Sequence, residues 1–416
     1  MAEAVNLYDL SRKERGAILA NEYTVEQSYG GWRVPSQSGN GTYVVVIDDD
    51  TETCTCPDFE KRGTRCKHIH AVEFTKEYKI TDDGDLQVTE TVTKTYSQNW
   101  SAYNDAQRSE YRVFMELLAD LCGRIAEPER DMGRPSKPLS DMMFACALKV
   151  YSGFSLRRFE SMMEVAQERG HIRETCDYST VSRYMNKPEV TELLHDLIAI
   201  SSAPLSAVET DFAVDSSGFS TSRFGRYFDY KHGQENKYRK WVKAHLCCGV
   251  ETNVVTAVSL TEGKAGDSPE FGPLVERTAE VFGIEEASAD KAYSSRANHD
   301  LVAELGGETY IPFKESATGR AKGSPAWKRM YHKFQMDTDE FREHYHKRSN
   351  VETAFHMLKT KFGDSVNAKK ECSQFNEVLL KILCHNVVVV IHELRESNID
   401  PGFLADDLDT ASELIS

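Results

Sequence analysis

The sequence predicts an α/β protein that carries a small β-rich module and a helical region ahead of its α/β layer. Residues 208–363 alternate short apolar strands with helices, residues 98–203 repeat apolar side chains at helical spacing, and residues 30–80 alternate as short strands do. A length of 416 residues suits two to four domains. With 40% hydrophobic and 28% charged residues, the composition is that of a soluble globular protein.

The first 80 residues divide into an N-terminal segment, 1–29, and the β-rich module, 30–80. Gly39, Asn40 and Gly41 supply turn chemistry, and an apolar run follows at residues 43–47. We therefore expect short strands joined by tight turns.

The helical region spans residues 98–203. Phe114, Leu117, Leu118 and Leu121 recur at the spacing of one helix face. Ser155 stands where it would cap the next helix, and residues 133–138 are a linker with Gly and Pro.

The end of the helical region suits a helix-turn-helix. Ser179 would cap its recognition helix, and Thr180, Ser182 and Arg183 would face the major groove of DNA. A helix that only packs against the next domain fits the same pattern equally well.

The α/β layer predicts five strands followed by a C-terminal helix and an acidic tail. The strands are expected at residues 208–214, 241–250, 254–260, 284–289 and 309–313, with helices at 269–282 and 342–362. A further helix begins near residue 376, and residues 395–416 hold six acids and one base.

The cysteines and the apolar runs predict a cytoplasmic protein. The N-terminus lacks the apolar core of a signal peptide, and the longest apolar run, near residues 387–391, is far shorter than a membrane span. Ten cysteines are too dilute for a disulfide framework.

Three of those cysteines and a histidine have the spacing of a metal site. Zinc in a structural site takes four ligands at tetrahedral corners, and two close pairs joined by a short loop can supply them. The residues are Cys54, Cys56, Cys66 and His68, spaced as Cys-x-Cys and Cys-x-His. A group of buried thiols is the alternative, although the loop is rich in charge. The stretch resembles the SWIM-type zinc finger, which implies a structural zinc in a module that binds DNA or protein.

Three carboxylates are candidates for metal-dependent phosphoryl transfer, which uses acids that hold two divalent metals. Asp215 ends an apolar strand before a turn, Asp290 ends a short segment, and Glu352 lies in a helix. On that helix Tyr345, Arg348, Glu352 and Lys359 share one sector. An ordinary surface helix with a pair between Arg348 and Glu352 explains the periodicity as well.

The spacing of these four helix residues resembles the Tyr-2-Arg-3-Glu-6-Lys signature of DDE insertion-sequence transposases. AVDSSGFS and ADKAYSS resemble the first and second aspartate motifs of that family, and the resemblance covers residues 205–390. It implies an RNase H-like core, a mixed five-stranded sheet flanked by helices. In that core Asp215, Asp290 and Glu352 would hold Mg²⁺ or Mn²⁺, and Tyr345, Arg348 and Lys359 would contact DNA. Ala292 departs from the family, in which many members carry glycine before the aromatic residue.

The resemblance implies a DNA transposase that cleaves strands at transposon ends and transfers the 3′-hydroxyl into target DNA. Its partners would be the terminal repeats, target DNA and a second copy of the chain in a homodimer or higher synaptic complex. The alternative is a domesticated, non-catalytic protein that binds DNA or other proteins through its zinc module. Intact carboxylates at all three motif positions favour the enzyme.

The charge argues against DNA only when it is averaged over the chain. The net charge is 50 − 66 = −16. Residues 223–243 hold seven bases and two acids, and residues 314–333 hold six bases and one acid. Aromatic residues such as Trp327 and Tyr331 alternate with the cations, so these windows are expected to form the walls of a DNA channel.

Other polar residues near the motifs have ordinary structural explanations. Asp211 lies on the same strand face as Asp215, and solvation at the strand entry is its expected role. Asp267 is expected to serve the free amides of a helix start. His232 and His245 flank the second strand and are expected to be structural.

Overall fold

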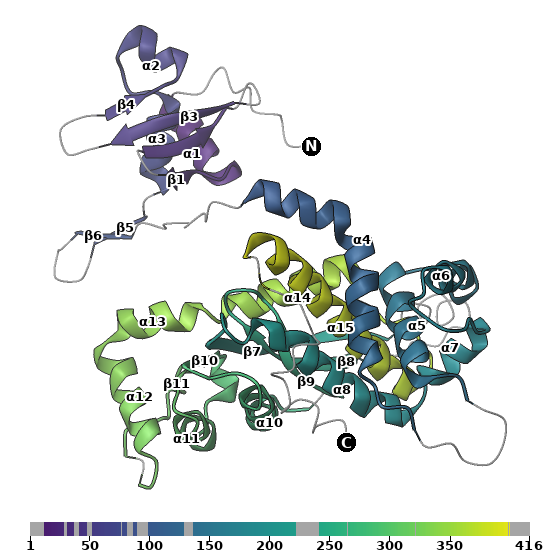
Figure 1. Ribbon diagram of the computed structural model, residues 1–416. Coiled ribbons are helices and arrows are strands. Elements are labelled where there is room, and N and C mark those ends of the chain that lie inside the picture. The colour runs from purple at the N-terminus through teal and green to yellow at the C-terminus, as the bar shows by residue number, and fades with distance from the viewer. Residues whose placement is uncertain are drawn as a thin grey trace, which may run out of the picture. The chain divides into compact units, whose positions relative to one another are not determined.

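The structure is a computed structural model (Figure 1), and it describes residues 12–28, 31–36, 41–47, 52–75, 77–80, 86–89, 99–128, 136–221, 241–263, 265–320, 322–397 and 399. Most of the predicted 1–29 segment, Gly39, Asn40, the start of the 133–138 linker, residues 223–240 with His232, and the acidic tail from residue 400 lie outside these ranges. The chain divides into two compact units, Met1–Gln98 and Asn99–Ser416.

The first unit is built on a four-stranded antiparallel sheet in the order β1-β2-β3-β4. The strands are β1 (Glu26–Ser28), β2 (Gly31–Pro35), β3 (Thr42–Ile47) and β4 (Glu52–Cys54), and the helices are α1 (Arg12–Glu22), α2 (Pro57–Arg62) and α3 (Lys67–Thr75). A separate antiparallel pair joins β5 (Glu77–Ile80) to β6 (Leu86–Thr89).

The core of the first unit follows from strand alternation. Trp32, Val34 and Val45 are buried together with Ile69 from α3. Helix α1 packs closely on α3 through Gly16, where an added Cβ would lie 2.6 Å from the Cβ atom of His70. Glycine is therefore required at this crossing.

The second unit begins with the helical region. Its helices are α4 (Trp100–Gly123), α5 (Leu139–Ser152), α6 (Leu156–Glu168), α7 (Tyr178–Tyr184) and α8 (Pro188–Ser202). The apolar face that Phe114 and its neighbours predict on α4 is buried. Ser155 occupies the predicted N-cap position of α6, although its side chain makes no capping hydrogen bond. The prediction that Ser179 caps α7 is wrong, because the cap is Asp177, which accepts a hydrogen bond from the backbone N–H of Ser179 at 2.7 Å.

The five-stranded sheet has the order β11-β10-β7-β8-β9. Strands β7 (Asp211–Ser220), β8 (Trp241–Gly249) and β9 (Val255–Glu262) are antiparallel, whereas β10 (Glu286–Ala289) pairs in parallel with β7 and with β11 (Glu308–Tyr310). The mixed five-stranded sheet of the predicted RNase H-like fold is therefore confirmed.

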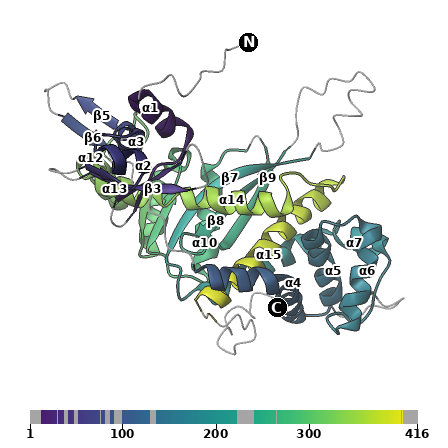
Figure 2. The same ribbon diagram turned by 90° about the horizontal axis from the view of Figure 1, so that it is seen from above.

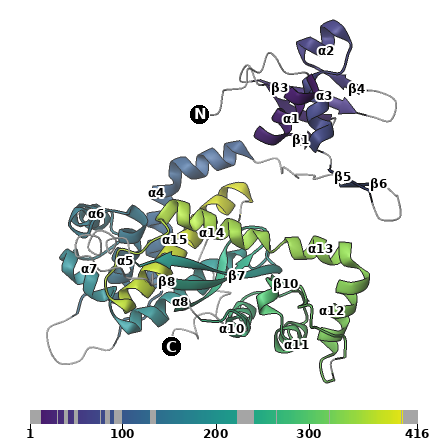
Figure 3. The same cartoon turned by 180° about the vertical axis from the view of Figure 1, so that it is seen from behind.

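Helices cover both faces of this sheet (Figures 1 and 3). Helices α10 (Ser268–Ala279) and α11 (Arg296–Glu304) lie on one face, and α14 (Ser349–Phe362) and α15 (Glu371–Glu396) lie on the other. Two further helices, α12 (Pro325–Met336) and α13 (Thr338–His346), precede α14. Strand β7 alternates between the faces, with Phe212 and Val214 toward α10, and Ala213 and Phe219 in the core that contains α14. Figure 2 shows α14 crossing over β7 and β8.

Helix α15 is buried along most of its length, and an asparagine fixes its position. The side chain of Asn386 accepts a hydrogen bond from the backbone N–H of Val255 at 2.9 Å and donates to the carbonyl of Val255 at 2.7 Å. It also donates to Ser201 Oγ at 3.0 Å, so that α15, α8 and β9 meet at one side chain. Among the described residues, no helix combines the length and the apolar character that a membrane span requires.

Candidate active site and metal centre

Asp215 and Asp290 lie side by side at the centre of the sheet. Strands β7 and β10 are parallel with Val214 opposite Ala289, so the next residue in each case is an aspartate, Asp215 within β7 and Asp290 directly after the end of β10. Neighbouring strands are about 4.8 Å apart, which brings the two carboxylates together. The prediction that the strand ends at Asp215 is wrong, because β8 pairs with β7 as far as Ser220. Only the parallel pairing stops at Val214, and this opens the position beside Asp215.

The segment that carries the third carboxylate is bent. The sequence predicts one helix over residues 342–362, but the structure has α13 and α14 with a turn between them. The backbone N–H groups of Lys347 and Arg348 bond to the carbonyls three residues earlier, at 3.2 and 3.0 Å, instead of four. The bend turns both side chains toward the sheet, and Tyr345 lies on a different helix from Glu352.

Arg348 bridges two of the candidate carboxylates. Its Nη1 donates to Asp215 Oδ2 at 2.8 Å, and its Nη2 donates to Glu352 Oε1 at 2.6 Å. The Asp215 side chain is 21% exposed and that of Glu352 is 59% exposed, so the cluster opens to solvent through Glu352. The structure therefore brings Asp215, Asp290, Glu352 and Arg348 together.

The electrostatics of the cluster are those of crowded acids. Burial raises the pKa of Asp215, and the negative charges of Asp290 and Glu352 raise it further, against the opposing effects of the Ser216 backbone N–H and Arg348. Three carboxylates from separate elements form a set of hard oxygen donors, which fits a divalent cation such as Mg²⁺ or Mn²⁺.

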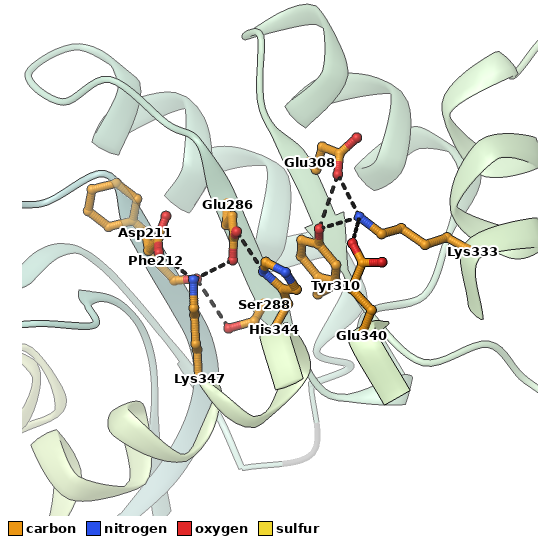
Figure 4. A network of polar contacts seen from close by, with 10 residues as sticks. All are labelled: Asp211, Phe212, Glu286, Ser288, Glu308, Tyr310, Lys333, Glu340, His344 and Lys347. Carbon is orange, nitrogen blue, oxygen red and sulfur yellow. Dashed lines mark hydrogen bonds and ion pairs between the residues drawn. The ribbon is translucent and has the colours of Figure 1, made fainter. Parts of the chain in front are cut away.

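A second ion-pair network holds the bend against the sheet (Figure 4). Lys347 Nζ contacts Asp211 Oδ2 at 2.6 Å and Glu286 Oε2 at 2.7 Å, and His344 Nδ1 lies 2.7 Å from Glu286 Oε1. The prediction that Asp211 is a solvated strand-entry residue is wrong, because it anchors Lys347. Consecutive residues, Lys347 and Arg348, thus contact two acids on the same face of β7.

The far end of α14 is also fixed. Lys361 Nζ lies 2.6 Å from Glu110 Oε1 on α4, and Glu110 accepts a second hydrogen bond from Tyr151 at 2.6 Å. Because α14 is held at both ends, the position of Glu352 between them is determined by the whole unit.

The structure gives Asp267 a different role from the helix cap that the sequence predicts. Asp267 occupies the N-cap of α10 but makes no capping hydrogen bond. Its Oδ1 accepts a hydrogen bond from Ser216 Oγ at 2.9 Å, forms an ion pair with Lys243, and lies 3.5 Å from Nδ1 of the buried His245. Ser216 follows Asp215 directly, so Asp267 supports the strand segment that carries the first catalytic candidate. The Asp-Ser-Pro sequence pointed to a cap, and only tertiary contacts with β7 and β8 reveal this arrangement.

The second aspartate motif forms a short helical turn. Asp290 caps the 3-10 turn Lys291–Tyr293, and its Oδ1 accepts a hydrogen bond from the Lys291 backbone N–H at 2.6 Å. Among the described residues, Asn253 is the only non-glycine with positive φ, so the turn places no special demand on Ala292. Tyr293 is 1% exposed, and burial raises its pKa. The alanine is therefore compatible with the site.

The remaining candidate DNA contacts lie in different environments. Lys359 Nζ donates to Ser217 Oγ at 2.6 Å and lies 5.3 Å from the ring centre of Phe219, so it points along β7. Tyr345 is half-buried against the aromatic cluster around Phe313. Ser182 and Arg183 are exposed on α7, whereas Thr180 is only partly so.

The described part of the second basic window does not offer its aromatic residues for stacking. Trp327 is 9% exposed, its ring packs on Phe313 at 4.8 Å, and its Nε1 donates to the carbonyl of Thr318. Tyr331 also packs on Phe313, at 5.3 Å. The expectation that these rings line a DNA channel is wrong, because they form the core of the α12–α13 region.

The first unit gathers the predicted zinc ligands. The candidate ligand atoms of Cys54, Cys56, Cys66 and His68 all lie within 4.8 Å of one another, and all four residues are buried. His68 Nδ1 is 3.8 Å from the sulfur of Cys54 and 3.8 Å from that of Cys66. A tetrahedral zinc site has ligand separations of about 3.6 Å, so the four side chains fit a zinc ion. A hydrogen bond with Cys54 lowers the pKa of the Cys66 thiol and favours the thiolate that zinc binds.

Comparison with protein families agrees with both sites. The model of the transposase DDE domain matches residues 206–387, which contain all three candidate carboxylates, and the model of the SWIM zinc finger matches residues 43–77. The described geometry and these matches lead to one conclusion: the chain combines a transposase DDE domain with an N-terminal SWIM zinc finger.

Proposed function

We propose that this chain cleaves DNA strands at transposon ends and joins the freed 3′-hydroxyl to target DNA, with Asp215, Asp290 and Glu352 as its metal-binding carboxylates. The observation that carries the proposal is the convergence of these side chains, from two parallel strands and one helix, around Arg348. Divalent metal bound at such carboxylates supplies activation of the attacking oxygen and stabilisation of the leaving oxygen.

The side chains of the chain itself provide placement and charge. Arg348 is held by Asp215 on one side and Glu352 on the other, so its guanidinium is oriented for a phosphate that approaches the exposed face of Glu352. Lys359 lies farther along β7 and would contact the same strand. We assign Tyr345 the role of a wall of this site.

Strand cleavage tests the proposal. Purified protein with Mg²⁺ or Mn²⁺ should nick or join a DNA fragment that carries the gene with its flanking sequences. The Glu352→Gln variant should lose this activity while it retains DNA binding, measured without added Mg²⁺ or Mn²⁺. Glu343→Gln is the matched control, because Glu343 is an exposed acid on α13 and its change removes the same charge.

Two outcomes would reject the proposal. Equal cleavage by the Glu352→Gln variant would remove Glu352 from the site. DNA binding without cleavage by the unaltered protein, with either metal and with flanking DNA on both sides, would favour the non-catalytic alternative. Sedimentation with and without that DNA would test the proposed homodimer or higher assembly.

A further inference from the structure

A cavity of about 770 Å³ lies in the second unit, outside the candidate active site. Its walls come from the turn between α5 and α6, from α7, and from the loop 367–370 with the first turn of α15. Helix α14 connects this region to the triad, since Phe362 at its end is ten residues, or about 15 Å, beyond Glu352.

Four cations line the cavity, namely Lys149, Arg183, Lys369 and Lys370. Among the described residues, no carboxylate lies within 4.0 Å of any of them. Other lysines of this unit, such as Lys243, Lys347 and Lys361, are neutralised by acids. The cavity therefore holds four cations and one acid, Glu377, and none of the four cations forms an ion pair within the described part of the chain.

The acid in the cavity wall is already engaged. Glu377 accepts hydrogen bonds from the backbone N–H groups of Asn367 and Ala368, each at 2.9 Å, and from Asn367 Nδ2 at 3.2 Å. It holds the loop whose next two residues are Lys369 and Lys370. The carboxylate thus positions two of the cations without pairing with them.

The walls of the cavity are locked together. Asn376 Nδ2 donates to the carbonyls of Met185 and Lys187, at 3.0 and 3.2 Å, and Ser373 Oγ donates to Asn186 Oδ1 at 3.0 Å. These contacts tie the end of α7 to the start of α15, so the cations face a preformed site.

Two further features match a nucleotide unit. Phe154 is 38% exposed in the cavity wall, and the guanidinium of Arg158 lies 4.7 Å from its ring centre, which forms a platform for a base. Helices α6 and α15 both begin at the cavity, and the side chains at their N-caps make no capping hydrogen bond. Their free backbone N–H groups add to the attraction for a phosphate.

We infer that this cavity binds the phosphodiester backbone of DNA, at a second contact site separate from the triad. The identity of the partner as DNA rests on the proposed function, whereas the recognised chemistry, phosphate next to a base, rests on the cavity itself. A DNA molecule bound here and at the triad would lie along α14.

The test measures DNA binding without cleavage. Fluorescence anisotropy with a labelled duplex of flanking sequence is recorded without added Mg²⁺ or Mn²⁺ at several salt concentrations. Lys369→Glu/Lys370→Glu should weaken DNA binding at least tenfold. The loss of about two phosphate contacts should also make the slope of log K against log salt less steep, by roughly 0.9 for each contact. Both lysines are exposed, so the fold should persist, which thermal denaturation checks.

Arg108→Glu/Arg112→Glu is the control, because these exposed arginines lie on α4 outside the cavity and the net charge changes equally. Lys369→Arg/Lys370→Arg keeps the charge and should retain affinity. Equal loss in the cavity and control variants would overturn the inference. The inference would also fail if the cavity variant lost the binding of dAMP that the unaltered protein shows but bound the duplex as tightly as the control variant does. Because no cleavage is measured, an inactive triad would not affect the result.

Discussion

Replacing Asp267 with asparagine tests whether this residue supports the active site. The change keeps the shape of the side chain and one hydrogen-bond acceptor but removes the charge that faces Lys243 and Ser216. Asp267 is 26% exposed and Lys243 is 18% exposed, so the pair is only partly screened by solvent. A charge-assisted hydrogen bond contributes about 1.5–3 kcal/mol, and the acceptor that asparagine retains reduces the expected loss of unfolding free energy to about 1–2 kcal/mol.

The pH dependence of this loss has a definite sign. Burial would raise the pKa of Asp267, but hydrogen bonds from Lys243 and Ser216 outweigh it and lower the pKa. The stabilisation is therefore complete above the pKa of about 3.9 that an unfolded aspartate has, and it disappears as the pH falls through the folded value. The variant should differ most from the unaltered protein near neutral pH.

Thermal denaturation in EDTA and DNA cleavage are the two measurements. We expect the Tm to fall by about 2–6 °C and cleavage to fall at least tenfold, because the uncharged acceptor holds Ser216, and with it the segment next to Asp215, less firmly. Glu262→Gln, an exposed acid at the end of β9, is the charge-matched control and should have little effect. An unchanged Tm together with unchanged cleavage would refute the supporting role of Asp267.

Three other substitutions test the remaining sites. Cys66→Ser should abolish stoichiometric zinc in the purified protein by atomic absorption; unchanged zinc would contradict the Cys₃His centre. Asp215→Asn should raise the Tm in EDTA at pH 7, because burial raises the pKa of Asp215 and the ionised carboxylate therefore destabilises the folded protein. The gain in Tm should vanish below about pH 3.9, where the carboxyl group is protonated in the unfolded chain as well. A lower Tm of the variant at pH 7 would argue against crowded acids. Lys347→Met should lower the unfolding free energy by about 2 kcal/mol in urea denaturation, because Asp211 and Glu286 lose their shared cation, and an unaltered midpoint would show that the network is not stabilising.

Local sequence patterns predicted those parts of the protein that are formed by residues close together in the sequence. The zinc module depends on Cys54, Cys56, Cys66 and His68, which are close in sequence, and the structure gathers them as their spacing indicates. The five strands of the sheet were likewise predicted from short apolar runs. The other strand ends differ from the predicted ones by at most three residues, whereas the strand through Asp215 continues six residues further, to Ser220, because of its pairing with β8.

The bend before α14 and the support from Asp267 depend on distant partners. Helical periodicity is satisfied by one long helix or by two, and the bend is stabilised by Lys347 with Asp211, 136 residues away. Asp267 has the local sequence of a helix cap, while its hydrogen-bond partner Ser216 is 51 residues away. The periodicity of the sequence carries no information about either contact.

The burial of α15 has a consequence for the order in which the chain can fold. This helix contacts α4, α5, α8 and β9, and Asn386 fixes its position against elements synthesised more than 130 residues earlier. A chain ending at residue 370 would contain Asp215, Asp290 and Glu352 and yet expose the apolar faces that α15 covers. During synthesis the carboxylates are therefore present well before the core can close, and the cleavage activity proposed above would have to wait until α15 has left the ribosome.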